Sequence, residues 1–153
     1  MRYIVVPIVA VAAEGGSSSP AAVEAPACDD ALAHWVSAAS RSLDACLVVD
    51  GEGTVSALSS TAADLLGTLA DSVVGRSLDE VLHLVDFTDS AHEARGADRR
   101  IPPLIAVREN ALSRGMMRVR RPDGARLMLD AVAAPIHDTD RNPVGAVSFL
   151  ASV

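Results

Sequence analysis

The sequence predicts an α+β fold in which one antiparallel sheet of five strands carries short helices on one face. Two short apolar runs joined by a Gly-containing turn come first, segments with helical spacing follow, and three alternating segments end the chain. Strands at both ends of a domain, with the helices clustered between them, are typical of α+β folds and not of alternating β-α-β folds.

The front of the domain is predicted to be a hairpin followed by a short helix. Residues 45–50 and 54–58 are the two apolar runs, and the Gly-rich stretch between them favours a tight turn. The hydroxyl side chains at 59–61 are good helix caps, so we expect a helix over 62–66 that ends at Gly67.

Two further helices are expected in the middle of the domain. Ser77 and Glu80 have the spacing of a capping box, and apolar residues at helical spacing follow them. Pro102 predicts the start of the second helix, because proline is tolerated in a first turn, and this helix is expected to run to about Ser113 and stop at Gly115.

The last three strands are predicted from alternation and from turn residues. They cover residues 116–121, 126–134 and 144–151, and Pro122-Asp123-Gly124 forms the first turn between them. The five strands therefore lie two before the helices and three after them.

An amphipathic helix is expected to flank this domain over residues 28–42, after a Gly/Ser/Pro/Ala linker at 14–27. Its apolar stripe would be left exposed outside a domain that already has a core. We therefore expect a homodimer whose interface contains Leu32, Trp35, Val36 and Ala39. The alternative is that the helix folds back over its own sheet and the protein is a monomer.

An apolar run of 11 residues precedes the linker, at residues 3–13. It is too short to span a bilayer, which needs about 20 residues, so no membrane span is expected. One interpretation is a β-strand that docks on its own sheet or on a partner subunit. A short export signal is the second, because Ala10-Val11-Ala12 resembles a cleavage site. Disorder in solution is the third.

Composition excludes several classes of function. Acidic residues outnumber basic ones 20 to 13, which gives a net charge of −7 and argues against binding to nucleic acid. Two cysteines cannot form a disulfide framework, so we expect a reducing, cytoplasmic location. The one basic cluster is interpreted as a solvated strand face, with an acidic partner surface as the alternative, and contains Arg114, Arg118, Arg120, Arg121 and Arg126.

Catalytic and metal-binding motifs are not found in the sequence. There is no Gly-x-Ser-x-Gly motif, and no histidine stands in a recognisable relation to a serine or a cysteine. Four residues near one another have possible ligand side chains, but a solvated loop explains them equally well, so no metal site is assigned to His83, Asp86, Asp89 and His92. We expect no enzymatic activity.

Six short motifs in register make residues 43–153 resemble a PAS domain, the small sensory module of signalling proteins. The motifs lie at 47–55 (LVVDGEGTV), 62–67 (AADLLG), 74–78 (VGRSL), 120–124 (RRPDG), 134–138 (APIHD) and 143–147 (PVGAV). The sequence departs from the family pattern in two places. A serine, Ser59 or Ser60, replaces the asparagine that often follows the second strand, and the loop at 86–101 is atypical.

The resemblance implies a pocket between the sheet and its helices, and a non-catalytic role in sensing or protein interaction. Such a module binds a small ligand or a partner and signals through dimer packing to an unidentified signalling protein. A ligand-binding or dimerising scaffold of PAS-like or GAF-like fold, without a sensing role, is the alternative. The pocket is expected to be lined by Val48, Leu66, Leu82, Leu104, Ile105, Val119, Leu129 and Val147.

The resemblance also raises the question of a cofactor. No cofactor is the principal expectation. Haem-binding members of the family ligate iron through a histidine on a helix over the pocket, and His83 is the candidate for that role here. Flavin of the light-sensing kind is a weaker candidate, because Cys46 falls in the first strand and Cys28 falls outside the domain.

Overall fold

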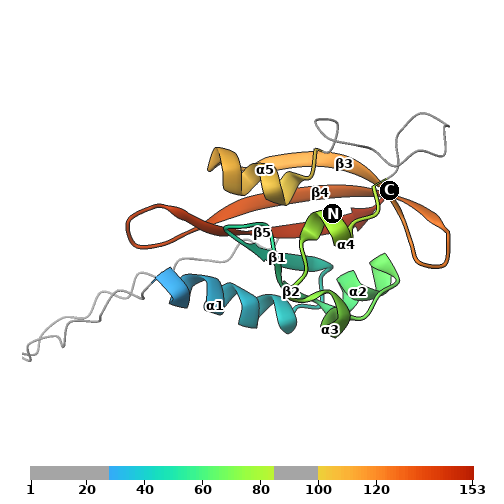
Figure 1. Ribbon diagram of the computed structural model, residues 1–153, viewed down its shortest axis with the longest axis horizontal. Coiled ribbons are helices and arrows are strands. Elements are labelled where there is room, and N and C mark those ends of the chain that lie inside the picture. The colour runs from blue at the N-terminus through green and yellow to red at the C-terminus, as the bar shows by residue number, and fades with distance from the viewer. Residues whose placement is uncertain (1–27, 85–99) are drawn as a thin grey trace, which may run out of the picture.

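The computed structural model describes residues 28–84 and 100–153, which form one five-stranded antiparallel sheet with helices on both of its faces (Figure 1). The strand order is β2-β1-β5-β4-β3, so the first and last strands of the domain are neighbours at its centre. The strands are β1 (Cys46–Asp50), β2 (Val55–Leu58), β3 (Ser113–Arg120), β4 (Arg126–His137) and β5 (Pro143–Ser152). The predicted α+β fold class is confirmed.

Five helices accompany the sheet in the described part of the chain. The N-terminal flanking helix α1 packs on one face, and the four others contribute to the core on the opposite face. Their bounds are α1 (Cys28–Ser40), α2 (Ser60–Leu66), α3 (Ala70–Val73), α4 (Leu78–Val81) and α5 (Pro102–Glu109).

The helix α2 ends where the sequence predicts, and it begins at Ser60, two residues before the predicted start, with one of the predicted caps. Ser59 is its N-cap and accepts a hydrogen bond from the Ala62 amide at 3.1 Å. The same buried hydroxyl accepts from the Cys46 amide at 3.0 Å and donates to the Asp44 carbonyl at 2.8 Å. Gly67 closes the helix in the left-handed region, at φ 68°. Ser59 thus ties the start of β1 to the start of α2.

Two local predictions about the other helices are wrong, and one short helix was not predicted. The capping box does not form, because the Ser77 side chain makes no capping hydrogen bond and α4 is a single turn. The helix from Pro102 ends at Glu109, since Asn110 adopts φ 49°, and Gly115 lies inside β3. The one-turn helix α3 has no counterpart in the prediction, because four residues are too few to show helical periodicity.

The two faces of the sheet bury two separate apolar clusters. Leu47 and Val49 of β1 belong to the cluster under α2, α4 and α5, whereas Cys46 and Val48 belong to the cluster under α1. Val147 of β5 also lies under α1. The prediction that Val48 and Val147 face the pocket helices is therefore wrong. The reason is that β1 is buried on both faces, and a continuous apolar run does not show which set of residues faces which layer.

The flanking helix α1 folds back over its own sheet. Leu32 and Val36 are half-buried and pack against Val48 and Val147 in the second cluster, and Ala39 is 3% exposed. These residues pack inside the chain and so offer less apolar surface than the sequence suggests, and the dimer interface stays a prediction. Trp35 is the member of the predicted stripe that remains on the surface, at 39% exposure.

Several sequence predictions lie outside the described residues: the apolar run 3–13, the linker 14–27, and Asp86, Asp89 and His92. Within residues 28–84 and 100–153, no helix has the length and apolar character needed to cross a bilayer.

Candidate functional site

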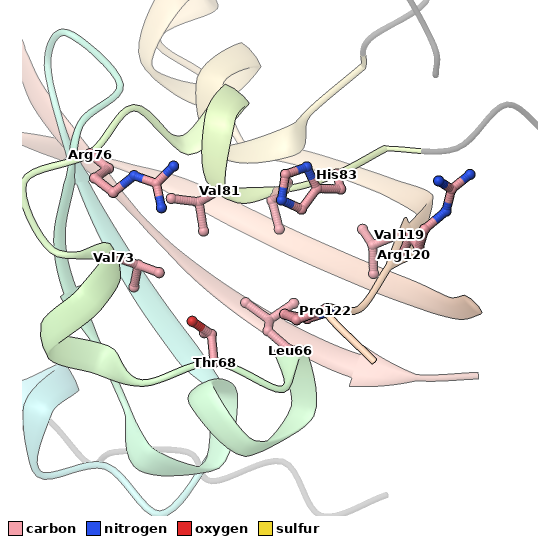
Figure 2. A pocket seen from close by; sticks show the side chains of 10 residues that line it. Leu66, Thr68, Val73, Arg76, Val81, His83, Val119, Arg120 and Pro122 are labelled. Atoms are coloured by element: carbon pink, nitrogen blue, oxygen red, sulfur yellow. The ribbon is translucent and has the colours of Figure 1, made fainter. Parts of the chain in front are cut away.

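A cavity of about 110 Å³ lies between the α2–α4 segment and the end of β3 (Figure 2). Its apolar lining includes Leu66, Leu82 and Val119, three of the predicted pocket residues, together with Val73 and Val81. An engineered apolar cavity of about 150 Å³ accommodates benzene, so this one has room for a molecule of only a few heavy atoms.

The short stretch that contains α4, over the cavity, is hydrogen-bonded to the sheet region on both sides of this helix. At one end, the Val55 amide donates to the Arg76 carbonyl at 2.8 Å, and the Leu78 amide donates to the Gly53 carbonyl at 2.9 Å. At the other end, the Arg120 amide donates to the His83 carbonyl at 2.8 Å. Between these attachments α4 has only one turn. The backbone on the two sides of α4 is thus bonded to β2 and the turn before it, and to the end of β3.

Polar side chains stand at the rim of the cavity. Figure 2 shows Arg76, Val81 and His83 along one side, with the Thr68 hydroxyl directed toward the interior from the opposite side. The Thr68 hydroxyl lies 3.2 Å from the Ser72 hydroxyl. The guanidinium of Arg120 is directed outward, although this residue also belongs to the lining.

The charge at this rim is positive and unpaired within the described part of the chain. No carboxylate is among the described residues that line the cavity. The side chains of Arg76 and His83 form no hydrogen bond or ion pair with any residue in 28–84 or 100–153. Arg114 pairs with Asp130 at 2.6 Å elsewhere on the sheet, and Arg121 pairs with Asp123 at 3.8 Å near the edge of the cavity.

A second cationic side chain lies at the edge of the same region. The residues on either side of Arg121, and those on either side of Gly67, line the cavity. Arg121 packs on Gly67 so closely that a Cβ atom there would lie 2.7 Å from its Nε. This Nε is buried and has no hydrogen-bond acceptor among the described residues, with the nearest Asp123 oxygen at 3.8 Å.

The remaining predicted pocket residues do not line this cavity. Leu129 is fully buried in the core under the helices, and Leu104 packs against that core from α5. Ile105 is half-buried and lies outside both clusters. The helix α5 instead buries Pro103 and Ala106. Val48 and Val147 lie on the opposite face, under α1.

The described residues do not fit haem or a light-sensing flavin. A cavity of about 110 Å³ is far below the roughly 300–1,000 Å³ of pockets for larger ligands, and a porphyrin or an isoalloxazine ring system does not fit in it. His83 lines the cavity, but it lies after the end of α4 and not on the helix as predicted, and it is exposed. Cys46 is buried in the cluster under α1, and its Sγ lies 3.8 Å from the Ala39 carbonyl oxygen. The sheet therefore separates this thiol from the cavity.

Sequence reasoning missed the polar part of the site. It singled out apolar residues and His83, but not Arg76 or Thr68. Arg76 lies within the motif VGRSL, which carries the family resemblance but does not indicate the direction of its side chain. Its position over the cavity depends on the α3–α4 turn, which local periodicity did not predict.

Comparison with known proteins agrees with this architecture. The family model described as the PAS fold matches residues 33–153. No curated protein matches the chain. The PAS domain of a protein from Colwellia psychrerythraea superposes with a TM-score of 0.59 at 20% identity, over 80% of this chain and 96% of that one.

Two light-oxygen-voltage (LOV) structures are also similar. The LOV protein of Rhodobacter sphaeroides gives a TM-score of 0.63 at 16% identity, over 82% of this chain and 68% of that one. The LOV domain of the blue-light photoreceptor Aureochrome1 gives a TM-score of 0.57 at 18% identity, over 77% of this chain and 88% of that one. At these identities the likeness shows the fold alone.

The fold and the site define a small α+β module with a cavity between its sheet and its short helices. Because the PAS model covers most of the described residues, the chain belongs to the PAS family.

Proposed function

We propose that this chain is a non-catalytic PAS sensory and protein-interaction module that binds a small ligand in the cavity under α3–α4. The observation that carries the proposal is the pairing of this cavity with a covering segment attached to two strands. A ligand in the cavity contacts Val73, Val81 and Leu82, and these residues lie in or next to α3 and α4. The backbone of the same segment is bonded to β2 and to the end of β3.

The proposed signal passes through the sheet to its opposite face. The edge strand β2 pairs with β1, whose alternate residues pack on the two faces. Val48 and Ala57 contact the α1 layer, while Leu47 and Val55 belong to the core nearest the cavity. A shift of β2 would therefore change the packing of α1 against β1 and β2. We propose that a second copy or an unidentified signalling protein detects this change.

Binding, and not catalysis, is supported by the chemistry of the described lining. It combines apolar side chains with arginine, histidine and threonine, and no thiol or carboxylate is among its described members. Nucleophilic and general acid–base catalysis normally need a nucleophile or acid oriented by a partnered base. One matched structure is described as that of a blue-light photoreceptor, so the same fold serves a sensor in that protein. A cytoplasmic location remains part of the proposal.

Mass spectrometry of the small molecules released from freshly purified protein tests the proposal. We expect a ligand to be released from the wild type and to be reduced at least about tenfold in Val81→Phe, whose larger ring fills the cavity. Val107→Phe is the matched control, because Val107 is also half-buried against the core but does not line the cavity. An absorbance spectrum of the same sample reports any haem or flavin.

Two results would contradict binding in the cavity, and a third would contradict the sensing role. Equal ligand loss in Val107→Phe would mean that general repacking, and not occupancy of the cavity, removed the ligand. Unchanged ligand content in Val81→Phe would place the ligand elsewhere. Ligand binding without any change in hydrogen exchange at α1 or β2 would favour the scaffold role without sensing.

A further inference from the structure

We propose that the cavity selects small organic anions, whose carboxylate faces Arg76 and His83 and whose short carbon chain lies on Leu66, Val73 and Val119. This inference rests on the proposed function, because it names the class of ligand for the same cavity. It follows from three observations on the described residues: the unpaired rim, the division of the lining and the size of the space.

The unpaired rim is the first observation. Arg76 and His83 lie on one side of the cavity and have no acidic partner within residues 28–84 and 100–153 (Figure 2). Arginine carries a permanent positive charge and forms its strongest hydrogen bonds with carboxylate and phosphate oxygens. The Thr68 hydroxyl, directed inward from the opposite side, supplies another hydrogen-bonding group.

The orphaned guanidinium nitrogen strengthens this electrostatic argument. The buried Nε of Arg121 lacks an acceptor among the described residues, and Arg121 stands between two residues of the lining. A buried donor without a partner costs free energy, and a nearby negative charge reduces that cost. Asp123 supplies a negative charge at 3.8 Å, which is too far for a hydrogen bond, so the Nε still lacks an acceptor among the described residues.

The division of the lining distinguishes an organic anion from a simple inorganic one. Leu66, Val73 and Val119 are buried residues of the core that also line the cavity. Their surfaces give no favourable contact to a fully hydrated ion, but they stabilise a hydrocarbon chain. A volume of about 110 Å³ limits this chain to a few carbon atoms.

Titration of the full chain with sodium butyrate and butanamide, followed by ¹H–¹⁵N NMR, tests the inference. The two probes have nearly the same shape and differ in charge. We expect butyrate to shift the amide signals of Thr68, Val81 and Leu84, and to bind at least about tenfold more tightly than butanamide. Inorganic phosphate is expected to bind more weakly than butyrate.

The variants Arg76→Gln and Arg126→Gln remove the same charge at different places. We expect Arg76→Gln to abolish the preference for butyrate over butanamide while the amide probe binds as before. Arg126 is exposed at the start of β4 and outside the lining, so Arg126→Gln is expected to leave both affinities unchanged.

The outcomes separate this inference from the proposed function. Equal affinity for the two probes, or equal loss in Arg126→Gln, would overturn the anion selectivity and leave a ligand cavity in place. Phosphate binding as tight as butyrate binding would overturn the organic part of the inference. Identical shifts in wild type and Val81→Phe, or no shifts with any probe, would show that the cavity binds none of them, and the proposed function would fail with the inference.

Discussion

At the scale of single residues, Gly145 shows how closely two neighbouring strands and the helix α1 approach one another. It lies in β5 opposite Asp50 of β1, and α1 passes over it. A Cβ atom at this position would overlap the carbonyl oxygen of Val49 and would lie 2.9 Å from Cδ1 of Leu32. The carbonyl group of Val49 belongs to the backbone of β1 and cannot rotate away from the added methyl group as a flexible side chain could. Gly145 is therefore required by the approach of β1 and α1.

We expect Gly145→Ala to lower the free energy of unfolding by about 2–3 kcal/mol, because β5 must move away from β1 to admit the methyl group. Urea denaturation followed by circular dichroism measures the change. Gly51→Ala is the control, since a Cβ there would meet the Val144 carbonyl oxygen at an ordinary 3.7 Å. We expect Gly51→Ala to lower the free energy of unfolding by less than about 1 kcal/mol. Equal losses in the two variants would refute the steric argument.

Ser59 is another residue whose role depends on contacts that are distant in sequence. The sequence identified residues 59–61 as caps of α2, and Ser59 performs this function. Its hydroxyl also bonds the amide of Cys46 and the carbonyl of Asp44, which lie 13 and 15 residues away. Capping was predictable because it is local, whereas the link to β1 exists only once β1 and β2 are paired.

At the scale of elements, the β4–β5 hairpin is organised by one carboxylate. Asp138 accepts hydrogen bonds from the amides of Asn142 at 2.8 Å and Asp140 at 2.9 Å, and from Nδ2 of Asn142 at 3.3 Å. The hydrogen bond from the Asn142 amide is the main cause that lowers the pKa of Asp138 below its ordinary value. A carboxyl group with a lowered folded-state pKa stabilises the fold above its unfolded-state pKa, and this stabilisation is lost as the pH falls through the folded-state pKa.

We therefore expect Asp138→Ala to be less stable than the wild type at pH 7, with a difference that narrows as the pH falls below about 4. Urea denaturation at a series of pH values measures this difference. Asp140→Ala keeps the backbone amide that bonds Asp138, so its stability should follow that of the wild type. A stability difference for Asp138→Ala that does not change between pH 7 and pH 3 would contradict the role of the ionised carboxylate.

The helix α1 shows how an element can be predicted correctly and placed incorrectly. Its apolar stripe was evident from the spacing of Leu32, Val36 and Ala39, and the helix exists. Its partner was not evident, because the outer face of a sheet and the helix of a second subunit present similar apolar surfaces. In the structure, α1 packs on the sheet, where it covers Cys46, Val48 and Val147.

At the scale of the whole molecule, α1 leaves part of the apolar surface uncovered. Trp35 of α1 and Phe149 of β5 are 39% and 46% exposed and line the same shallow depression of about 90 Å³. Val132 of β4, opposite Phe149 in register, is half-buried. Aromatic residues of this kind dominate the energetics of protein interfaces. We propose that a second copy covers this surface in a homodimer.

Sedimentation of the full chain checks the proposed dimer. We expect the wild type to be a dimer, and Trp35→Asp and Phe149→Asp to be monomers with unchanged circular dichroism. Leu43→Asp introduces the same charge at an apolar residue that is 91% exposed and outside this depression, so this variant should remain a dimer. A monomeric wild type, or dimeric Trp35→Asp and Phe149→Asp variants, would show that this surface is not the interface.

The candidate site was predictable only in its apolar half. Leu66, Leu82 and Val119 were placed correctly because amphipathic spacing marks the inward faces of helices and of half-exposed strands. Val48 and Val147 were placed on the wrong face, because strands that are buried on both faces show no alternation of apolar and polar residues. Arg76 and Thr68 reach the cavity from the ends of short turns, where no periodicity exists to predict a direction.

The sequence by itself determined the α+β class, the order of the strands along the chain, the cap and end of α2 and the family, because periodicity, turn residues and short motifs are local properties. Only the tertiary structure decided that β1 and β5 meet at the centre, that α1 covers its own sheet, and that Arg76 and His83 share the rim of one cavity. These features arise from contacts between residues far apart in the chain, which are fixed by the simultaneous burial of both faces of the sheet. The free energy of that burial depends on how the layers fit together, and no single segment encodes it.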